Sequence, residues 1–397
     1  MRHFDGRRVL LVVTGGISAY KSVSLLRLLT EAGASVEVLM TEAAEQMVGH
    51  VTFEALSGRP VHRNLWEKPL AHIELGRDSD LIIVAPATAD MLARMAQGLA
   101  GDLASATLLA AEAPILAAPA MNTRMWEHPA TRANVQRLSD AGVTMVGPTT
   151  GWLAEGETGE GRMEEPETIF AHAARRIAPA GELTGRKVVV TAGPTRAALD
   201  PVRYIGNRSS GRMGYALAQA AWTRGADVVL VSGPASVDPP VGPRVIEVET
   251  AGEMLEALRA ELEDAAVLAM VAAVADFAPA DVADEKIKKD GTAFDLSLAA
   301  GPDLLHETRD ARAEGGVFTL GFALETHDGV ANAQRKLREK GLDMVALNMA
   351  DEPDSGFDVE TNRVTLIEPD DAVEELPLLS KLEVAERLLD RIEERLA

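Results

Sequence analysis

Residues 187–234 read KVVVTAGPTRAALDPVRYIGNRSSGRMGYALAQAAWTRGADVVLVSGP, and this stretch decides the fold class of the second half of the chain. Residues 188–190 predict a buried strand, and a helical pattern of apolar residues runs from Met213 to the stop signal at Gly225. Residues 228–231 predict the next strand. Strand, loop, helix and strand make a βαβ unit, so the loop lies at the carboxyl edge of a parallel sheet, where open α/β sheets bind ligands.

The loop of this unit favours a nucleotide or a phosphate over a plain connector. It is far longer than the ~2–6 residues of most such loops. It ends in Ser210 and Gly211, and a serine cap with small glycines lets the helix N-terminus hold a phosphate. The stretch contains no P-loop motif, and its glycines at 206, 211 and 214 miss the dinucleotide-binding spacing.

Two motifs in this stretch also resemble those of a known family. TAGPTR followed by LDPVRYIGNRSSGRMG closely resembles the ligase half of the bifunctional coenzyme A biosynthesis proteins, in which phosphopantothenoylcysteine decarboxylase is joined to phosphopantothenate–cysteine ligase. The resemblance covers nearly the whole chain. It implies CTP-dependent ligation of cysteine to 4′-phosphopantothenate through an acyl-cytidylate. FMN-dependent decarboxylation of the product to 4′-phosphopantetheine would follow.

Length, composition and charge limit the classes of protein to which the chain can belong. A length of 397 residues predicts two domains, and 47% hydrophobic with 25% charged residues is typical of globular proteins. The net charge of −22 argues against nucleic-acid binding, and no apolar run is long enough for a membrane span. Because the chain has no cysteine, we expect a cytoplasmic protein. Five of its nine lysines fall within residues 286–340, which gathers cations for anionic ligands in an acidic chain.

The first half has the pattern of a doubly wound α/β domain, with helices between buried strands. The strands are expected at residues 8–13, 36–40, 81–85, 115–118 and 143–146. We therefore predict two Rossmann-like, doubly wound parallel-sheet domains, the first flavodoxin-like. The first spans residues 1–178, a linker residues 179–185, and the second domain residues 186–397.

Small and hydroxylated residues follow the strands of the first domain. By itself TGGIS after a strand commonly makes only a turn, but together with APATAD and PAMNTRMW it resembles the flavin-containing cysteine decarboxylases. That resemblance implies FMN contacts at Gly15, Ser18, Thr41, Thr88 and Ser105.

Two residues of this domain have both a purely structural and a functional interpretation. His72, in HIELG, is by pattern alone a surface or capping histidine, and Asn122, in PAMNTRMW, is a common turn residue. The resemblance instead implies that His72 is needed for decarboxylation and that Asn122 holds the substrate carboxylate.

The glycine-rich segment 147–163 resembles a mobile flap over the substrate. Many family members have a cysteine as proton donor where this chain has Glu155. A carboxyl group closed under a flap can have a raised pKa and donate a proton, so Glu155 or Glu157 is a candidate. The alternatives are that water or the substrate supplies the proton, or that the reductive half of the reaction has been lost.

The second domain carries further candidates after its strands. Asp276 follows a buried strand at 267–271, and a carboxylate in that position can bind Mg²⁺ or a ribose. The alternative is that Asp276 only forms a turn. The lysine run in residues 285–291 is either a solvated loop or a phosphate-neutralising one. An amphipathic helix is expected at about 379–396.

The resemblance sharpens these assignments. It implies Mg²⁺ at Asp276, and it implies nucleotide contacts at Ala273, Asp276, Lys286, Pro302, Asp303, Phe322, Lys336 and Lys340. Arg203 and Asn207 match residues that make and consume the acyl-cytidylate. An asparagine amide there can donate a hydrogen bond to developing negative charge.

Family members imply a homo-oligomer, with decarboxylase domains in trimers and ligase domains in dimers. The expected partners are otherwise small molecules: 4′-phosphopantothenate, cysteine and CTP. Three other functions compete with this interpretation. A nicotinamide dehydrogenase is disfavoured by the missing dinucleotide spacing. A ligase with an inactive or incomplete flavoprotein domain, and a flavin-binding regulatory protein, stay open.

Overall fold

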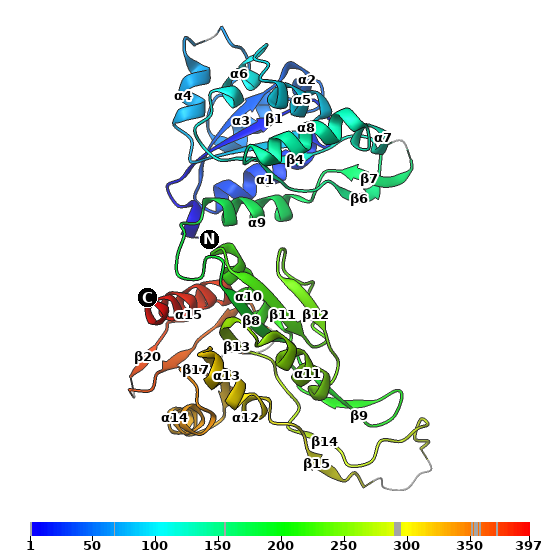
Figure 1. Cartoon of the computed structure of the whole chain (residues 1–397), viewed down its shortest axis with the longest axis vertical. Coiled ribbons are helices and arrows are strands. Elements are labelled where there is room, and N and C mark those ends of the chain that lie inside the picture. The colour runs from blue at the N-terminus through cyan, green and yellow to red at the C-terminus, as the bar shows by residue number, and fades with distance from the viewer. Residues whose placement is uncertain are drawn as a thin grey trace. The chain divides into compact units, whose positions relative to one another are not determined.

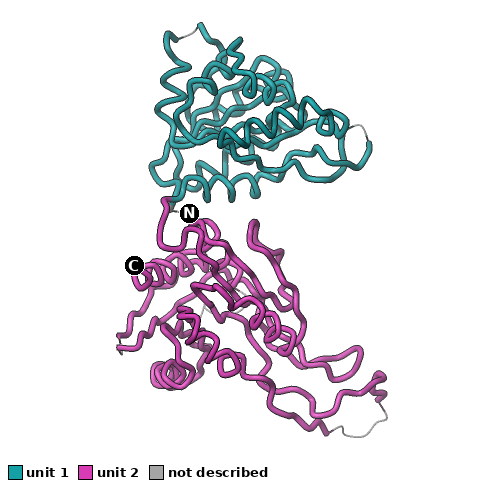
Figure 2. The backbone as a smooth tube through the Cα atoms, in the orientation of Figure 1, with its two compact units in different colours: residues 1–178 teal, residues 179–397 magenta. Residues whose placement is uncertain are grey.

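The computed structural model of the chain describes residues 2–66, 68–154, 156–289, 295–350, 352, 356, 359–370 and 372–397. Glu155, the predicted proton donor, therefore lies outside the described residues. The chain divides into two compact units, Met1–Ala178 and Pro179–Ala397 (Figure 2).

Unit 1 is built on a five-stranded parallel sheet with the order β2-β1-β3-β4-β5 (Figure 1). Its strands are β1 (Arg8–Val13), β2 (Ser35–Met40), β3 (Leu81–Ala87), β4 (Ile115–Pro119) and β5 (Thr144–Met145). All five predicted strands are confirmed, and the order is that of flavodoxin-like folds. The strand order reverses between β1 and β3, so a crevice for a ligand is expected beyond the carboxyl ends of these two strands.

Both faces of the unit 1 sheet are buried, because side chains alternate along each strand. Val9 and Leu11 of β1 belong to one core cluster, and Leu10 and Val12 to another. The first cluster is covered by α1 (Ala19–Glu31), α3 (His50–Ser57) and α9 (Pro166–Ile177). The second is covered by α4 (Ala71–Arg77), α5 (Ala89–Gln97), α6 (Leu103–Leu109) and α8 (Pro129–Asp140).

The predicted flap is an antiparallel hairpin of β6 (Thr149–Trp152) and β7 (Thr158–Arg162). It lies next to the short helix α7 (Thr123–Trp126). Two other short helices complete the unit, η1 (Arg2–Phe4) and α2 (Glu42–Glu45).

Unit 2 has an eight-stranded sheet with the order β12-β11-β8-β13-β16-β17-β19-β20. Its strands are β8 (Lys187–Ala192), β11 (Asp227–Ser232), β12 (Arg244–Glu247), β13 (Ala265–Met270), β16 (Phe318–Glu325), β17 (Met344–Met349), β19 (Thr365–Ile367) and β20 (Val373–Glu375). The predicted βαβ unit is confirmed, since β8 and β11 are parallel neighbours joined through α10 (Arg212–Thr223). The sheet is not purely parallel, because β19 and β20 extend it in antiparallel pairing.

Helices cover the unit 2 sheet as in a doubly wound fold. One core cluster joins strand residues to α11 (Ala251–Glu261), α12 (Leu304–Glu307) and α14 (Gly329–Lys340), with α13 (Arg309–Gly315) following α12. Helix α10 lies against β8 and β11 and packs along the C-terminal helix α15 (Lys381–Leu396). Part of the predicted linker is built into unit 2, because Leu183 is fully buried and the Gly185 amide donates to the Gly225 carbonyl oxygen.

An arm projects from this sheet (Figure 1). It consists of β9 (Arg196–Ala198), β10 (Tyr204–Gly206), β14 (Phe277–Pro279) and β15 (Leu298–Ala300), paired as β9 with β10 and β14 with β15. A further short pair joins β18 (Thr361–Asn362) to β21 (Leu379–Ser380). The arm brings the loop after β8 beside the loop after β13.

Candidate active sites

A cavity of about 880 Å³ lies in unit 2. Its wall is formed by the segments that follow β8 and β13, by the carboxyl-terminal parts of β16 and β17, and by α14, among others. Because these strands are parallel, their carboxyl ends meet at one edge of the sheet. The cavity is therefore at the edge where ligands bind in open α/β folds.

Most of the predicted ligase residues line this one cavity. They are Asn207, Ala273, Asp276, Pro302, Asp303, Phe322, Lys336 and Lys340. Arg203 and Lys286 do not line it. Residues from three loops, strand β16 and helix α14 thus converge, although they lie far apart along the chain.

The N-terminus of α10 opens on the cavity. Its N-cap is Gly211 in the left-handed conformation (φ 83°), without a side-chain cap, so the predicted cap at Ser210 is wrong by one residue. A Cβ on Gly214 would lie 2.6 Å from the Ala192 Cβ atom, so glycine lets α10 begin close against β8. Arg208 and Arg212 line the same end of the cavity. Free helix amides and two guanidinium groups suit a phosphate chain.

Two lysines enter the cavity from α14, one turn apart. The Lys336 ammonium group donates to the Phe322 carbonyl oxygen at 2.7 Å, and burial lowers the pKa of Lys336. Lys340 forms an ion pair with Asp303. Burial opposes ionisation of Asp303, but the ion pair and the His306 amide hold the pKa of Asp303 below its ordinary value. The C-terminal part of α14 therefore gives this side of the cavity two lysines, one of which is paired with a carboxylate.

The Asn207 side chain spans two backbone carbonyl groups of the neighbouring loop. Its Nδ2 atom is 3.1 Å from the Ala273 oxygen and 3.0 Å from the Val274 oxygen. An amide nitrogen carries two hydrogens, so both are in use. The donor role predicted for Asn207 does not fit this arrangement, because no amide hydrogen is left for a substrate oxygen.

Arg203 is held away from the cavity by Asp200. The Asp200 side chain has no exposed surface, and its oxygens accept from the Arg203 Nε atom at 2.9 Å and the Ile287 amide at 3.1 Å. Arg203 also donates to the Ile287 carbonyl oxygen at 2.6 Å. The hydrogen bond from Arg203 holds the pKa of Asp200 well below its ordinary value. The Arg203 loop is thereby joined to the segment that carries the exposed Lys286.

Asp276 lines the cavity, and its backbone oxygen accepts from the Gly301 amide at 2.8 Å. Within the described parts of the chain, no three acidic or histidine side chains gather as a metal site. A Mg²⁺ ion that is held mainly by substrate phosphates needs only one or two protein carboxylates. Asp276 fits that limited role.

Sequence reasoning missed several polar residues that line the cavity. They are Arg208, Arg212, Asn348, Asn362 and Lys381. Asn348 lies in β17 and its amide donates to the Asn362 side chain. The strand-end rule that pointed to Asp276 would have pointed to Asn348, had the strand at 344–349 been predicted. Lys381 is buried at the start of α15 and reaches the Gly356 carbonyl oxygen at 2.9 Å.

In unit 1, the loops after β1 and β3 are tied together at the expected crevice. The Thr14 hydroxyl donates to the Pro86 carbonyl oxygen at 2.6 Å, and Thr88 caps α5 by accepting from the Met91 amide. Ser18 is the N-cap of α1 but makes no side-chain cap bond, so its hydroxyl is not committed to the helix.

Gly15 lies in the loop after β1, where a Cβ would lie 2.3 Å from the Ala43 Cβ atom. Thr41 follows β2 and caps α2 by accepting from the Ala44 amide. Four predicted FMN residues are thus at the carboxyl edge of the sheet.

Ser105 differs from the other four. It is almost fully buried, and its hydroxyl donates to the Asp102 carboxylate at 2.6 Å within a capping box that begins α6. Its amide and hydroxyl are both used in that box. Ser105 is therefore explained as a capping residue, and the predicted FMN contact through its hydroxyl is not supported.

His72 is on α4, and its Nδ1 atom is buried without a hydrogen-bond partner among the described residues. Helix α4 packs closely on α6, since a Cβ on Gly76 would lie 3.1 Å from the Thr107 carbonyl oxygen. A buried imidazole nitrogen without a partner is unusual in a purely structural histidine. The environment of His72 thus leaves one ring nitrogen available.

Asn122 caps α7, and its Oδ1 atom accepts from the Arg124 amide at 2.8 Å. The flap hairpin lies directly against this turn. The Met121 amide donates to the Gly161 carbonyl oxygen at 2.9 Å, and a Cβ on Gly159 would lie 2.2 Å from the Thr123 hydroxyl oxygen. Glycines in β7 therefore allow the hairpin to approach the Asn122 turn closely.

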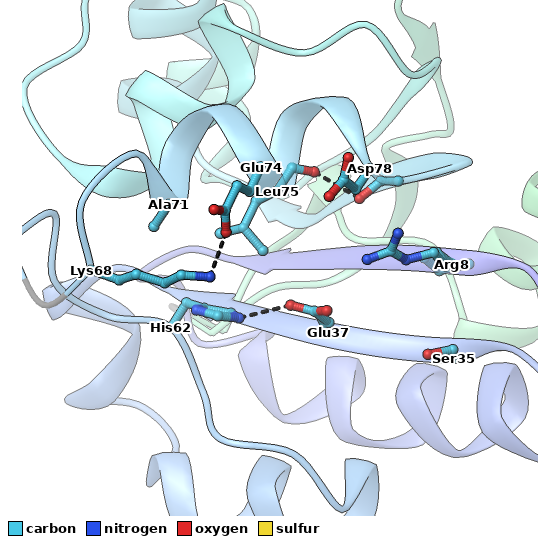
Figure 3. A pocket seen from close by; sticks show the side chains of 11 residues that line it. Arg8, Ser35, Glu37, His62, Lys68, Ala71, Glu74, Leu75 and Asp78 are labelled. Atoms are coloured by element: carbon cyan, nitrogen blue, oxygen red, sulfur yellow. Dashed lines mark hydrogen bonds and ion pairs between the residues drawn. The ribbon is translucent and has the colours of Figure 1, made fainter.

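A smaller cavity of about 140 Å³ lies elsewhere in unit 1 (Figure 3). Four of its polar side chains are paired with one another: His62 with Glu37 at 2.8 Å, and Lys68 with Glu74. The hydrogen bond from His62 lowers the pKa of Glu37. Arg8, at the start of β1, lines this cavity, so it lies toward the amino end of the strand, away from the loops expected to bind FMN.

No described helix is both long and apolar enough to cross a membrane. Comparison with known proteins divides the chain at the same place as its contacts do. Residues 1–178 match the family profile described as "Flavoprotein". Residues 183–396 match that of the "DNA/pantothenate metabolism flavoprotein C-terminal domain".

The curated relatives share the full length of the chain. The coenzyme A biosynthesis bifunctional protein CoaBC of Vibrio vulnificus is 43% identical over 99% of this chain and 99% of its own. That of Bacillus subtilis is 42% identical over 98% and 97%. The crystal structure of the C-terminal domain of a CoaBC protein is 37% identical with a TM-score of 0.47, covering 55% of this chain and 98% of that one. The chain therefore belongs to the CoaBC family of bifunctional coenzyme A biosynthesis proteins.

Proposed function

We propose that unit 2 is the CTP-dependent ligase of this chain and unit 1 its FMN-dependent decarboxylase. As a family member, the chain carries a ligase and a decarboxylase activity of coenzyme A biosynthesis. The observation that carries the ligase assignment is the convergence of eight predicted residues on one cavity of about 880 Å³. That volume accommodates a nucleotide and a second substrate, since drug-sized ligand pockets span ~300–1,000 Å³.

In the ligase, the α10 N-terminus with Arg208 and Arg212 would hold phosphate groups of the substrates. Lys336 and Lys340 would neutralise the nucleotide from α14, and Asp276 would share a Mg²⁺ ion with its phosphates. Activation of 4′-phosphopantothenate releases pyrophosphate and leaves an acyl-cytidylate. The cysteine amine then displaces CMP.

The choice of CTP over another nucleotide rests on the family resemblance. Phe322 of β16 lines the cavity, and its ring would stack on the base.

In the decarboxylase, the loops after β1 and β3 fit a flavin phosphate. Ser18 has an uncommitted hydroxyl at the start of the 13-residue helix α1, and these loops follow the two strands between which the strand order reverses. When bound, FMN would take up electrons from the substrate thiol and make loss of CO₂ easy.

The residues of unit 1 would then bind and shield the substrate. Asn122 would orient its carboxylate, His72 would offer the free ring nitrogen, and the flap would exclude water. The proton donor stays a prediction at Glu155 or Glu157. The trimer of decarboxylase units, the dimer of ligase units and the cytoplasmic location likewise stay predictions.

A direct experiment tests both halves. The purified protein should carry a flavin spectrum. With CTP, Mg²⁺, cysteine and 4′-phosphopantothenate it should yield 4′-phosphopantetheine by mass spectrometry. Omission of Mg²⁺ should stop the ligation, while decarboxylation of added 4′-phosphopantothenoylcysteine continues. A product that stops at 4′-phosphopantothenoylcysteine would contradict the decarboxylase assignment, and no cysteine-dependent product would contradict the ligase assignment.

A further inference from the structure

Arg312, on α13, is a buried arginine that holds the backbone of two segments of the ligase cavity. Its side chain is 3% exposed, and Arg312 does not itself line the cavity. Its Nη2 atom donates to the carbonyl oxygens of Leu305 at 2.8 Å and Lys340 at 2.9 Å, two residues that do line it. Its Nη1 atom donates to the Gly341 carbonyl oxygen at 3.1 Å. Arg312 therefore joins α12 to the C-terminal end of α14.

The other N–H groups of Arg312 donate to hydroxyl groups. The Nη1 atom also donates to the Thr319 hydroxyl of β16 at 3.1 Å, and the Nε atom donates to the Thr308 hydroxyl at 3.3 Å. Since a guanidinium group has five N–H groups in a fixed plane, each of them has an acceptor here. Burial lowers the pKa of Arg312, but a guanidinium group stays protonated at neutral pH. Its charge is thus placed at the C-terminal end of α14, where the helix dipole favours a cation.

On the cavity side, the same two segments meet through the ion pair between Lys340 and Asp303. Asp303 begins α12 by accepting from the His306 amide at 3.0 Å. The side chains of Lys340 and Asp303 are 29% and 47% exposed, and an ion pair with such exposure contributes little to holding two segments together. The spacing between α12 and the end of α14 is therefore set mainly by the buried hydrogen bonds of Arg312.

We propose that Arg312 is a positioning residue for the nucleotide, which fixes the spacing at which Lys340 and Asp303 face the cavity. The proposal deepens the ligase function proposed above and rests on it. The Lys340 ammonium group has three N–H donors, so it can keep Asp303 and bind a phosphate oxygen at the same time. Both bonds form together only if α12 and α14 keep one distance, because a charge-assisted hydrogen bond spans a narrow range of lengths. Arg312 thus acts through Lys340 and does not touch the substrate.

The test is the steady-state kinetics of pyrophosphate release by the full-length enzyme with CTP, 4′-phosphopantothenate and cysteine. Arg312→Lys keeps the positive charge but has three donors in place of five, so it cannot hold both segments. We expect the KM for CTP to rise about 10-fold, the effect of one lost hydrogen bond to a charged group. The KM for cysteine should change by less than about twofold. A purely structural arginine would instead lower the folded fraction, and hence the apparent kcat, and leave both KM values unchanged.

Arg309→Met is the matched control. Arg309 is on the same helix and donates to the Glu339 carbonyl oxygen near the same end of α14, at 3.4 Å, but it is exposed. Its removal should leave the KM for CTP within about twofold of the wild-type value, because surface substitutions have small effects.

A double variant tests whether Arg312 acts through Lys340. Lys340→Met should raise the KM for CTP by itself. Adding Arg312→Lys should then raise it by less than about threefold more, because the effects of coupled residues do not add. If Arg312→Lys does not fold, Thr308→Val takes its place. This variant keeps the arginine but removes the acceptor of its Nε atom, and it should raise the KM for CTP about threefold without changing that for cysteine.

An unchanged KM for CTP in folded Arg312→Lys, or in Thr308→Val where the lysine variant does not fold, would overturn the proposal. So would an equal rise in the KM values for CTP and cysteine, or a full effect of Arg312→Lys on top of Lys340→Met. A wild type that releases no pyrophosphate from CTP with 4′-phosphopantothenate would contradict the ligase function itself, which is a different result.

Discussion

The ion cluster between α10 and α15 allows a stability prediction that separates buried from exposed charge. Arg224, just after α10, donates to Glu386, Asp390 and Glu393 of α15 at 2.6, 2.6 and 2.5 Å. The Arg224 side chain is 9% exposed and that of Glu386 only 4%. Arg224→Met keeps most of the volume but leaves the three carboxylates without their arginine.

The expected loss is about 3–5 kcal/mol in the free energy of unfolding, the usual range when one partner of a buried ion pair is removed. That is a large part of the ~5–15 kcal/mol that stabilises a typical domain. The matched control is Arg391→Met on α15, the helix that carries the three carboxylates. Arg391 is 42% exposed and pairs with exposed carboxylates of Glu374 and Glu394, so its loss should cost about 0–1 kcal/mol.

The assay is urea unfolding of the full chain, with ligase activity reporting on unit 2 and flavin fluorescence on unit 1, because two units need not unfold together. The ligase midpoint should fall sharply in Arg224→Met and hardly in Arg391→Met, with the flavin midpoint unchanged in both. Helix α15 begins at Lys381, which lines the cavity, so unfolding of the helix should also abolish ligase activity. Equal midpoints in the two variants would refute the reasoning from burial.

Three further outcomes are expected. Because Arg203 holds the pKa of Asp200 below its ordinary value, this carboxylate stabilises the fold above about pH 4. The difference in unfolding free energy between wild type and Asp200→Asn should thus be constant above about pH 5 and shrink as the pH falls further. In Gly161→Ala the new Cβ would lie 2.2 Å from the Met121 oxygen, so decarboxylation should fall by about 100-fold while ligation continues. His72→Asn should keep FMN bound but abolish decarboxylation, and loss of flavin from the purified variant would instead make His72 structural.

Much of the fold could be predicted because its signals are local. Buried strands of unit 1 are continuous apolar runs, and each stands out in a window of a few residues. The parallel arrangement follows from the alternation of strands and helices, and with it the place of Asp276 at the carboxyl edge of the sheet, whereas Phe322 was assigned only through the family resemblance. β19 and β20 were missed because each has three residues, too few for a pattern.

The sequence by itself determined that the loop after β8 and Asp276 after β13 lie at one edge of the unit 2 sheet, since the carboxyl ends of parallel strands lie together. Only the tertiary structure decided what each group can do there. Both amide hydrogens of Asn207 are taken by carbonyl oxygens of a loop that lies more than 60 residues further along the chain. Arg203 is directed to Asp200, and Ser105 to Asp102, by neighbours that satisfy their hydrogen-bonding groups first. A hydrogen bond depends on distances of a few tenths of an ångström between such segments, and those distances are set by packing rather than by any local pattern.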